Sequence, residues 1–555
     1  MQMDLRFLLG AANSYARATR RLVRRRPSET FLCVLLCLLV LAVSNRPFSL
    51  LFRYLHSEEN MRPKADRLKQ RRIQAATQYF TSRGKKRDNS QSDDRDVHTQ
   101  GESAVKARSD SVDRGADRGA HTSRTEEEEE RTQHIRDVEK GKVAGREGEV
   151  DTESTGTHTQ DRPGKRARQR EEFSGKTPRV VIGLVTVKRN SSESLGYALQ
   201  SAAALDSLLH RHRHNDLFSH SLLYICNVDY NPDLHEDAVF LKDYVTTVER
   251  YGVSSSPLAS EVSSLTIPWL DPPVTYGELH HPLVLEKERF DYMFCLHAGL
   301  LFRPRYVMLV EDDALALPDM PGVVEHALNR VRHALDTRPH HPTFHVRWNA
   351  SEAPCPSNYS EPLEELVDSA REAFPAGPVS VPRFAYLKLY FPPLWQGFAL
   401  EVPQLLDLFS MTVVLAALFT GIMTLVLRRS PSLRTVRRVV VVSLVLVLLT
   451  GRQNANELRR VSRHLYRLQT SPDCCTPAVL YPADVIPPLV TWLVHSGPRA
   501  HVDLCIAEFV RRFALPAFIV EPNLFSHIGQ VTSLNLTRNR SDSDEVLFHD
   551  SLTYF

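Results

Sequence analysis

Residues 81–172 contain no leucine, methionine, cysteine or aromatic residue, and they are rich in charged residues, serine, threonine and glycine. A segment with so little apolar surface to bury cannot offset the conformational entropy lost on folding, so we predict that it is disordered. This absence argues against a folded domain in the stretch. We therefore interpret residues 53–175 as a lumenal stem that is mostly disordered.

Three further absences narrow the class of protein. The formal net charge is only +3 in 555 residues, which gives no support for nucleic-acid binding. No Cys-X-X-Cys pair occurs, which argues against a structural zinc site. The apolar runs of the second half contain almost no polar residues apart from serine and threonine, and this suits a channel or transporter subunit poorly.

The N-terminal region has the charge pattern of a membrane anchor. Residues 1–30 contain seven arginines, and the apolar run Phe31–Val43 follows directly. Because basic residues stay on the cytosolic side, we predict a cytosolic tail at 1–30 and a transmembrane signal anchor at 31–52. A cleaved signal peptide is the alternative, since the apolar core is short and Ala42-Val43-Ser44 resembles a cleavage site. Either way, the chain that follows enters the secretory lumen.

Glycosylation sequons and cysteines agree with a lumenal location. Six of the eight cysteines lie beyond the first apolar segment, where disulfides can persist, although the sequence does not fix their pairing. The five Asn-X-Ser/Thr sequons, all beyond that segment, are predicted glycosylation sites: Asn190, Asn349, Asn358, Asn535 and Asn539.

A second hydrophobic pattern interrupts the C-terminal half. The 20-residue run Leu408–Leu427 is long enough to cross a bilayer as a helix, and the shorter run Val439–Gly451 follows it. Between them, RRSPSLRTVRR carries five arginines and no acid. We predict transmembrane helices at 404–427 and 439–451 joined by a cytosolic basic turn at 428–438. The alternative is a soluble core in which the β-branched second run is a buried strand.

The remaining periodicity predicts an α/β fold. Unbroken apolar runs near 180–187, 222–226 and 306–310 are typical of buried strands, and residues 195–212, 282–302 and 319–336 have helical spacing. Alternating strands and helices favour a largely parallel sheet. We expect one domain, with its first part at 176–403 and its second part at 452–555, split by the transmembrane hairpin.

Polar residues stand at the ends of these strands. Glu311, Asp312 and Asp313 follow the third run, at the edge of the sheet where ligands bind in open α/β folds. Such carboxylates are hard ligands for Mg²⁺ or Mn²⁺, which can neutralise a diphosphate, although an acidic turn in water is an alternative. Four further residues, which end or follow the first two strands, are candidates for nucleotide-sugar binding: Thr186, Lys188, Arg189 and Asp229.

The motifs GLVTVKR, EKERFDYMFCL, YVMLVEDD, HVDLCIAEF and PNLFSHIG occur in this order. Together they resemble GT-A glycosyltransferases related to N-acetylglucosaminyltransferase IV. Because a hairpin lies inside the domain and an anchor precedes it, the chain resembles more specifically the family of Golgi transferases that add N-acetylgalactosamine to GPI anchors. The resemblance implies a GT-A, Rossmann-type domain in the Golgi lumen. It also implies UDP-GalNAc as donor, Mn²⁺ as metal and the first mannose of the GPI-anchor glycan as acceptor. The long charged stem departs from the family pattern.

On this interpretation Asp313 is a direct metal ligand, Asp312 and His527 complete the metal site, and Glu311 contacts ribose or metal-bound water. Asp503 is the candidate general base for an inverting transfer, with Glu508 in reserve. Asp503 could instead stabilise the start of a helix, and His527 could be an ordinary loop histidine. The alternatives in function are an N-glycan N-acetylglucosaminyltransferase and a catalytically inactive, GT-A-like glycolipid-binding protein.

Overall fold

The computed structural model describes residues 67–84, 177–189, 195–252, 261–262, 264–267, 273–281, 283–337, 367, 382–393, 396–398, 402–497 and 500–529. The predicted cytosolic tail (1–30) and signal anchor (31–52) lie outside these residues, as does most of the stem (53–175). So do the five predicted glycosylation sites, Asn190, Asn349, Asn358, Asn535 and Asn539.

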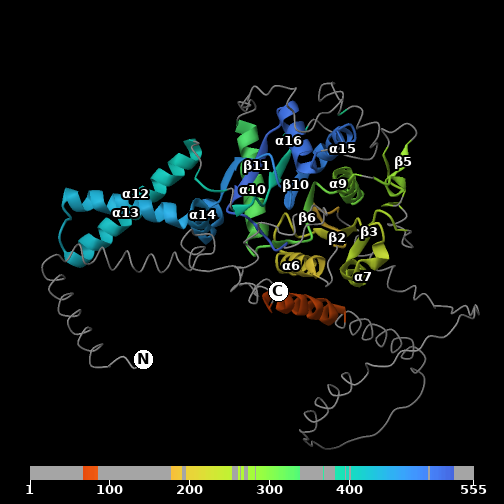
Figure 1. The fold of residues 1–555 in the computed structure, drawn as a ribbon, viewed down its shortest axis with the longest axis horizontal. Helices are drawn as coiled ribbons and strands as arrows, with labels where there is room; N and C mark the ends of the chain where they lie inside the picture. Colours follow the sequence, from red (N-terminus) through yellow and green to blue (C-terminus); the bar gives the residue numbers. More distant parts are fainter. Residues whose placement is uncertain are drawn as a thin grey trace, which may run out of the picture. The chain divides into compact units, whose positions relative to one another are not determined.

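A mixed eight-stranded sheet forms the centre of the fold, in the order β3-β2-β1-β6-β10-β8-β11-β9 (Figure 1). The α/β fold is thus confirmed. The strands β1 to β3 and β6 pair in parallel, whereas β10 runs antiparallel to both of its neighbours. The strands are β1 (Val180–Thr186), β2 (Leu222–Asn227), β3 (Thr246–Glu249), β6 (Tyr306–Glu311), β8 (Tyr386–Lys388), β9 (Arg467–Thr470), β10 (Ala478–Pro482) and β11 (Ala517–Glu521).

Strands from both sides of the hairpin alternate in this sheet. β10 comes from the chain after the hairpin, yet it lies between β6 and β8, which come from the chain before it. β11 in turn pairs in parallel with β8. Neither part of the chain therefore completes the sheet alone. Two short ladders accompany it: β4 (Thr266–Ile267) with β5 (Val274–Thr275), and β7 (Ala314–Ala316) with β12 (Phe525–His527).

Helices cover both faces of the sheet. One core packs α6 (Tyr197–Arg211), α7 (Glu236–Leu241) and α10 (Met320–Thr337) against one face, and the other packs α9 (Val284–Leu300), α15 (Ile486–Val494) and α16 (Val502–Arg512) against the opposite face. Single 3-10 turns connect these layers: η2 (Pro232–Leu234), η3 (Tyr276–Glu278), η6 (Glu457–Val461), η7 (Arg463–Leu465) and η8 (Ala483–Val485).

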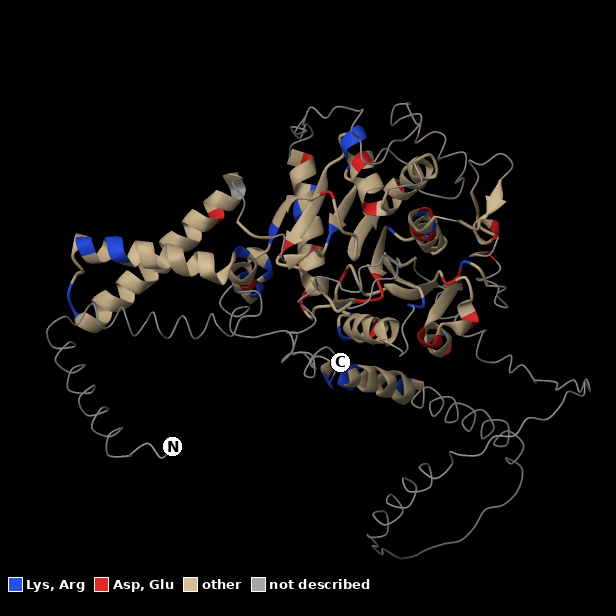
Figure 2. Ribbon diagram, viewed as in Figure 1, with Lys and Arg blue, Asp and Glu red and all other residues tan. Residues whose placement is uncertain are grey.

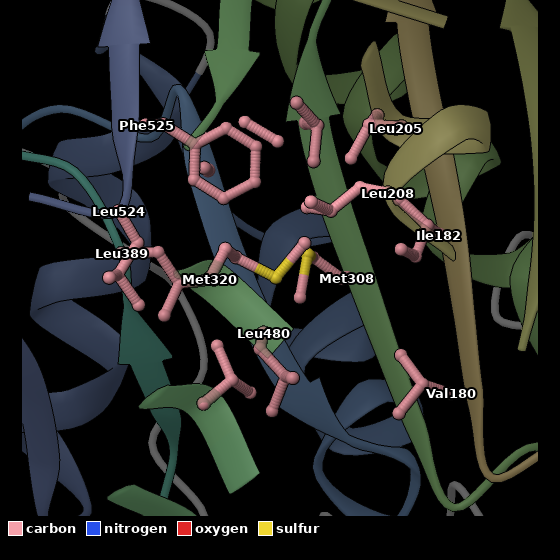
Figure 3. Close-up of a cluster of buried hydrophobic side chains, with 14 of the residues drawn as sticks. Val180, Ile182, Leu205, Leu208, Met308, Met320, Leu389, Leu480, Leu524 and Phe525 are labelled. Carbon is pink, nitrogen blue, oxygen red and sulfur yellow. The ribbon is translucent and has the colours of Figure 1, made fainter. Parts of the chain in front are cut away.

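The first core joins residues that are far apart in the sequence (Figure 3). Leu205 and Leu208 of α6 lie over Ile182 and Met308 of the sheet, while Leu524 and Phe525 from the C-terminal part complete the same cluster. All of these side chains are buried. The unbroken apolar strands predicted from the sequence are thus explained by a sheet that is covered on both faces.

A helix at 67–84, inside the segment interpreted as stem, packs against α6. Arg72 Nε donates to Gln200 Oε1 over 2.8 Å, and Tyr79 Oη donates to Asp206 Oδ2 over 2.7 Å. Ala76 and Phe80 are fully buried in the first core. This helix carries a weak sequence signal, because its apolar stripe is narrow and lies beside many charged residues.

The predicted hairpin consists of two helices joined by a short turn. α12 (Val402–Leu427) and α13 (Leu433–Thr450) pack together through Ala416, Phe419, Met423, Val439 and Leu446. The alternative of a buried strand at 439–451 is therefore wrong. α13 begins earlier than predicted, since the Ser432 Oγ accepts from Thr435 N and caps its first turn. α14 (Arg452–Asn456) follows α13 directly.

The charge pattern of the hairpin is strongly polarised. Figure 2 shows basic residues at the turn between α12 and α13 and in the first turns of α13, and none farther along the two helices. Among the described residues, Gln404–Leu427 is the one helix long and apolar enough to cross a membrane. Large apolar side chains along it are exposed, Phe409, Val414 and Leu425 among them. Membrane crossing by the whole hairpin and by the N-terminal anchor stays a prediction.

Disulfides are present, as predicted for a lumenal chain. Cys226 of β2 and Cys295 of α9 are joined, and Cys505 of α16 is also disulfide-bonded. Cys474 and Cys475 carry free thiols.

A buried histidine in α9 makes stability depend on pH. Burial lowers the pKa of His297 to about 4, whereas an unfolded imidazole titrates near 6.5. As pH falls below 6.5, His297 takes up a proton in the unfolded chain but not in the folded chain, which binds it only near pH 4. Stability is therefore lost between about pH 6.5 and pH 4. Lowering the pH from 7.5 to 5 should cost about 2 kcal/mol of unfolding free energy through this group.

Denaturant titrations of wild type and His297→Gln at both pH values measure this effect. The variant should lack that part of the loss, and His333→Gln, at an exposed position of α10, should behave as wild type. An equal loss in His297→Gln and wild type would contradict the assignment.

Candidate active site

The carboxyl ends of β1 and β6 lie side by side and carry the acidic residues. Val185 pairs with Glu311 in the parallel ladder, so Thr186 and Arg189, just beyond β1, reach Asp312 and Asp313, just beyond β6. The buried strands fix these positions because every backbone group of their central residues is engaged in the ladder. Sequence reasoning from strand ends thus identified a set of residues that the fold does bring together.

Arg189 joins the two aspartates. Its Nη1 lies 2.7 Å from Asp313 Oδ2, and its Nη2 donates to Asp312 Oδ1. The guanidinium carbon also lies 4.6 Å from the centre of the Tyr197 ring, a cation–π contact. A planar guanidinium can bind two carboxylates at once, which an ammonium group does less well. Arg189 is therefore occupied by the aspartates.

The second oxygen of Asp312 is also bound. Thr186 Oγ1 donates to Asp312 Oδ2 over 2.8 Å, and His235 Nε2 lies 2.7 Å from the same hydroxyl. Because the hydroxyl has a single proton, which goes to Asp312, His235 must donate through Nε2–H. Burial lowers the pKa of His235 to about 4, so the ring is neutral at pH 7. Ser201 Oγ further donates to the Asp312 main-chain oxygen over 2.7 Å.

Two further side chains, Glu311 and His527, lie beside Asp313. Glu311, Asp313 and His527 offer ligand atoms that all lie within 4.8 Å of one another, the spacing that one metal ion could bridge. The short strand β12 brings His527 here, since His527 pairs with Ala314 of β7 and Ile528 N donates to Asp313 O over 2.7 Å. His527 Nε2 lies 3.3 Å from Asp313 Oδ2.

The electrostatics of this group favour a bound cation. Burial and the neighbouring Asp313 carboxylate raise the pKa of Glu311 to about 8. Burial acts in the same sense on Asp313, but Arg189 and His527 outweigh it and hold the pKa of Asp313 well below its usual range. Asp313 Oδ1 is buried and has no hydrogen-bond partner among the described residues. The donor set of two carboxylates and one imidazole suits Mn²⁺, so the residues fit the metal that the sequence implied.

The geometry differs from the sequence-based assignment in one respect. Asp312 was expected at the metal and Glu311 at the ribose, yet Glu311 lies with Asp313 and His527, while both oxygens of Asp312 are bound to Arg189 and Thr186. The sequence could not separate the two residues because it does not show where the strand ends and the turn begins.

Asp503 lies near the start of α16, at the second helical residue. Its Oδ2 accepts from Cys475 N over 2.8 Å and its Oδ1 from Leu504 N over 2.7 Å, as expected for a carboxylate that stabilises a helix start. Glu508 is paired with Arg511 at 3.4 Å. The role of Asp503 as a base stays a prediction.

Glu288 of α9 links this helix start electrostatically to the acidic edge. His501 Nδ1 lies 3.2 Å from Glu288 Oε2. Burial raises the pKa of Glu288, with a further contribution from Asp503, and Glu288 itself contributes to the raised pKa of Glu311.

Lys188 and Asp229 bind each other rather than the carboxylates that follow β6. Lys188 N donates to Asp229 Oδ2 over 3.0 Å, and Asn231 N donates to Asp229 Oδ1 over 2.8 Å. Lys188 Nζ donates to Leu234 O over 3.0 Å. Asp229 therefore shapes the loop after β2. Sequence reasoning missed His235 and Ser201, because one histidine in a loop and one serine in a helix carry no motif.

The fold and the site define an α/β protein that holds clustered carboxylates, of a kind suited to a divalent cation, at the carboxyl edge of its sheet. A model of the GPI-N-acetylgalactosamine transferase PGAP4 family matches residues 180–346 and 361–526, more than half of the chain. The chain belongs to this family of glycosyltransferases, which confirms the resemblance found in the sequence. Membership implies a sugar donor and a GPI-linked acceptor. The match includes the hairpin, the carboxylates after β6 and Asp503.

Gly529 leaves space for the side chains of Asp313 and His527 in the cluster that they form with Glu311. A Cβ atom on Gly529 would lie 2.1 Å from Asp313 Oδ2, closer than such atoms can approach, and 3.1 Å from His527 Cε1, a very close contact. Gly529→Ala should therefore displace Asp313 or His527 and lower transferase activity by about 10-fold or more, a barrier increase of at least about 1.4 kcal/mol.

Gly322→Ala is the matched control, because nothing lies within 4 Å of its Cβ position in α10. Initial rates of sugar transfer by the two purified variants, with melting curves to verify folding, measure the effect. Full activity in folded Gly529→Ala would show that the geometry of this cluster does not matter for catalysis.

Proposed function

We propose that the protein transfers N-acetylgalactosamine from UDP-GalNAc to the first mannose of the GPI-anchor glycan, with inversion at the anomeric carbon. It would act as a multi-pass protein of the Golgi membrane with its catalytic domain in the lumen. The observation that carries the proposal is the cluster of Glu311, Asp313 and His527, with a buried Asp313 oxygen that has no protein partner among the described residues. Family membership supplies the class of donor and acceptor.

Glu311, Asp313 and His527 would hold Mn²⁺. When bound, the metal would neutralise the diphosphate of the donor and so stabilise the leaving UDP. The protein contributes a rigid cluster, since Asp313 is fixed by Arg189 and His527 by the β7–β12 ladder. Asp312 takes part indirectly, because it holds Arg189 and Thr186 in place.

The loops after β1 and β2 form the donor side of the proposed site. Lys188 and Asp229 tie these two loops together, so the backbone there has a defined shape for the nucleotide. In open α/β sheets the crevice outside the carboxyl ends of neighbouring strands is the usual ligand position. Thr186 and Arg189 shape this crevice through their bonds to the aspartates.

Asp503 is the proposed general base. In the transfer step the mannose hydroxyl oxygen forms a bond to the anomeric carbon, the bond to the β-phosphate oxygen breaks, and the hydroxyl proton passes to the Asp503 carboxylate. Each Asp503 oxygen accepts one backbone N–H and retains a second lone pair for this proton. The position at a helix start fixes the carboxylate for this role.

Two substitutions test the roles of metal ligand and base. Asp313→Asn should remove Mn²⁺ binding and reduce transfer by about 100-fold or more, whereas Asp503→Asn should lower kcat by about 10²–10⁴ and leave Mn²⁺ affinity unchanged. Asparagine has only one accepting oxygen and so keeps one of the two backbone hydrogen bonds of Asp503, and melting curves of the variant separate the loss of the base from the loss of the other bond. UDP release and product formation from a panel of UDP-sugars, with Mn²⁺ or chelator, measure both.

Asp336→Asn, on an exposed residue at the end of α10, is the control for the loss of one carboxylate. Transfer that persists in Asp313→Asn, or in excess chelator, would overturn the metal-dependent mechanism. Folded wild-type protein that binds the acceptor but transfers no sugar would instead indicate an inactive glycolipid-binding protein. Transfer to an N-glycan would indicate the other enzyme.

The hairpin is proposed to hold the domain at the membrane where the lipid-linked acceptor lies. Replacing residues 411–447 by a flexible soluble linker leaves Asp407 and Arg452 in place. Mn²⁺-dependent release of UDP should persist in this variant, while transfer to a GPI lipid falls by about 10-fold or more because the domain loses its second membrane attachment. The rate of transfer to a membrane-embedded acceptor should therefore fall more than the rate of transfer to a lipid-free acceptor glycan. Equal losses for both acceptors would contradict the proposal.

A further inference from the structure

Arg452, the residue just beyond the hairpin, is almost completely buried between two carboxylates. Its Nη1 and Nη2 donate to Glu521 Oε1 and Oε2 over 3.0 and 2.6 Å, and its Nε lies 3.1 Å from Asp407 Oδ2. Arg452 and Asp407 are each 2% exposed, and Glu521 is 5% exposed. Asp407 lies in α12, near its start, whereas Glu521 ends β11 of the central sheet. One guanidinium therefore connects both ends of the hairpin to the sheet.

Further side chains converge on the same three residues. The other oxygen of Asp407 is paired with Arg467 of β9 and lies 3.7 Å from Arg459. Gln469, also of β9, donates from Nε2 to Glu521 Oε2 over 2.9 Å. The network thus spans the edge of the sheet, and each of its two carboxylates has more than one partner.

The same anchoring continues along the chain from Glu521 to His527. The Asn523 side chain accepts from Phe391 N over 3.1 Å and from Gln396 Nε2 over 3.0 Å, and it donates to Phe391 O over 2.8 Å. The Asn523 main-chain oxygen accepts from Arg460 Nη2 over 2.6 Å. Residues 391–396 precede the hairpin and Arg460 follows it, so Asn523 is bound from both flanks.

The next residues lead directly into the candidate metal site. Leu524 N donates to Leu389 O over 2.8 Å, and Leu317 N donates to Leu524 O over 2.9 Å. Phe525 to His527 then form β12 against β7, which places His527 beside Asp313. Only five residues separate Glu521 from His527, and hydrogen bonds fix several of them.

We propose that Asp407, Arg452 and Glu521 form a positioning clamp, through which the two ends of the hairpin set the location of His527 in the metal site. The proposal rests on the proposed function, since it assigns His527 to the metal. The three residues touch neither donor nor acceptor and act through the segment 521–527.

The chemistry of the clamp favours positioning over simple stabilisation. A buried ion pair adds little net stability, because desolvation of the charges offsets their attraction, and apolar residues of similar size often do as well. A guanidinium forked onto a carboxylate, by contrast, fixes both distance and orientation. The clamp therefore suits the point where the helical hairpin must keep one register against β11, the strand that leads to His527.

Arg452→Lys tests the clamp, because lysine keeps the charge and loses the two-pronged contact with Glu521. In full-length protein, amide hydrogen exchange of residues 523–529 should become at least 5-fold faster. The dissociation constant for Mn²⁺, measured from the free-ion signal in electron paramagnetic resonance, should rise by at least 5-fold. Asp407→Asn, which breaks the contact with α12 and keeps Glu521, should change both quantities in the same direction.

Arg383→Lys is the matched control, since Arg383 forms an exposed pair with Asp336. A purely structural role for Arg452 would lower the melting temperature and leave both exchange at 523–529 and Mn²⁺ affinity unchanged, and that result would overturn the proposal. Unchanged exchange in both clamp variants would overturn it as well. If wild type bound no Mn²⁺, the metal assignment of the proposed function would fail, while the exchange rates would still decide whether the clamp holds this segment.

Discussion

The contact between Arg189 and the two aspartates after β6 is the constraint on which the site depends. Two adjacent buried carboxylates repel each other, and the single guanidinium offsets part of that repulsion while it fixes both side chains. With Asp312 held by Arg189 and Thr186, Asp313 lies beside Glu311 and His527 and keeps one oxygen, Oδ1, without a hydrogen-bond partner among the described residues. The arginine thereby divides the acidic motif into one residue that orders the site and two that are available to a cation.

The order of the strands has a second consequence. Because β10 inserts between β6 and β8, the sheet closes only after the chain has passed through α12 and α13 and returned. Glu311 and Asp313 precede the hairpin, whereas Asp503 and His527 follow it. In the proposed mechanism, metal site and base are therefore assembled from the two parts, and neither part could act alone.

The sequence predicted the elements whose signal is local. The apolar runs of β1, β2 and β6 and the helical spacing of α6, α9 and α10 need no tertiary context, and the strand-end rule identified Thr186, Arg189 and the acidic motif. The antiparallel insertion of β10 could not be predicted, because pairing across the hairpin leaves no local pattern. Whether Glu311 or Asp312 lies with Asp313 and His527 depends on side-chain direction at the strand end. An error of one residue in the predicted strand end reverses that direction.

The buried polar groups show why the hairpin is more than an attachment. Asp407, in a helix predicted to enter the membrane, would be unfavourable there as a lone charge, yet it is paired with Arg452 and Arg467. Its pairing requires the sheet edge to be formed, since Glu521 and β9 supply the other contacts. The hairpin can therefore pack in its observed position only when the sheet is complete. Because the strand that ends at Glu521 leads to His527, a chain with a misplaced hairpin would also lack an ordered catalytic edge.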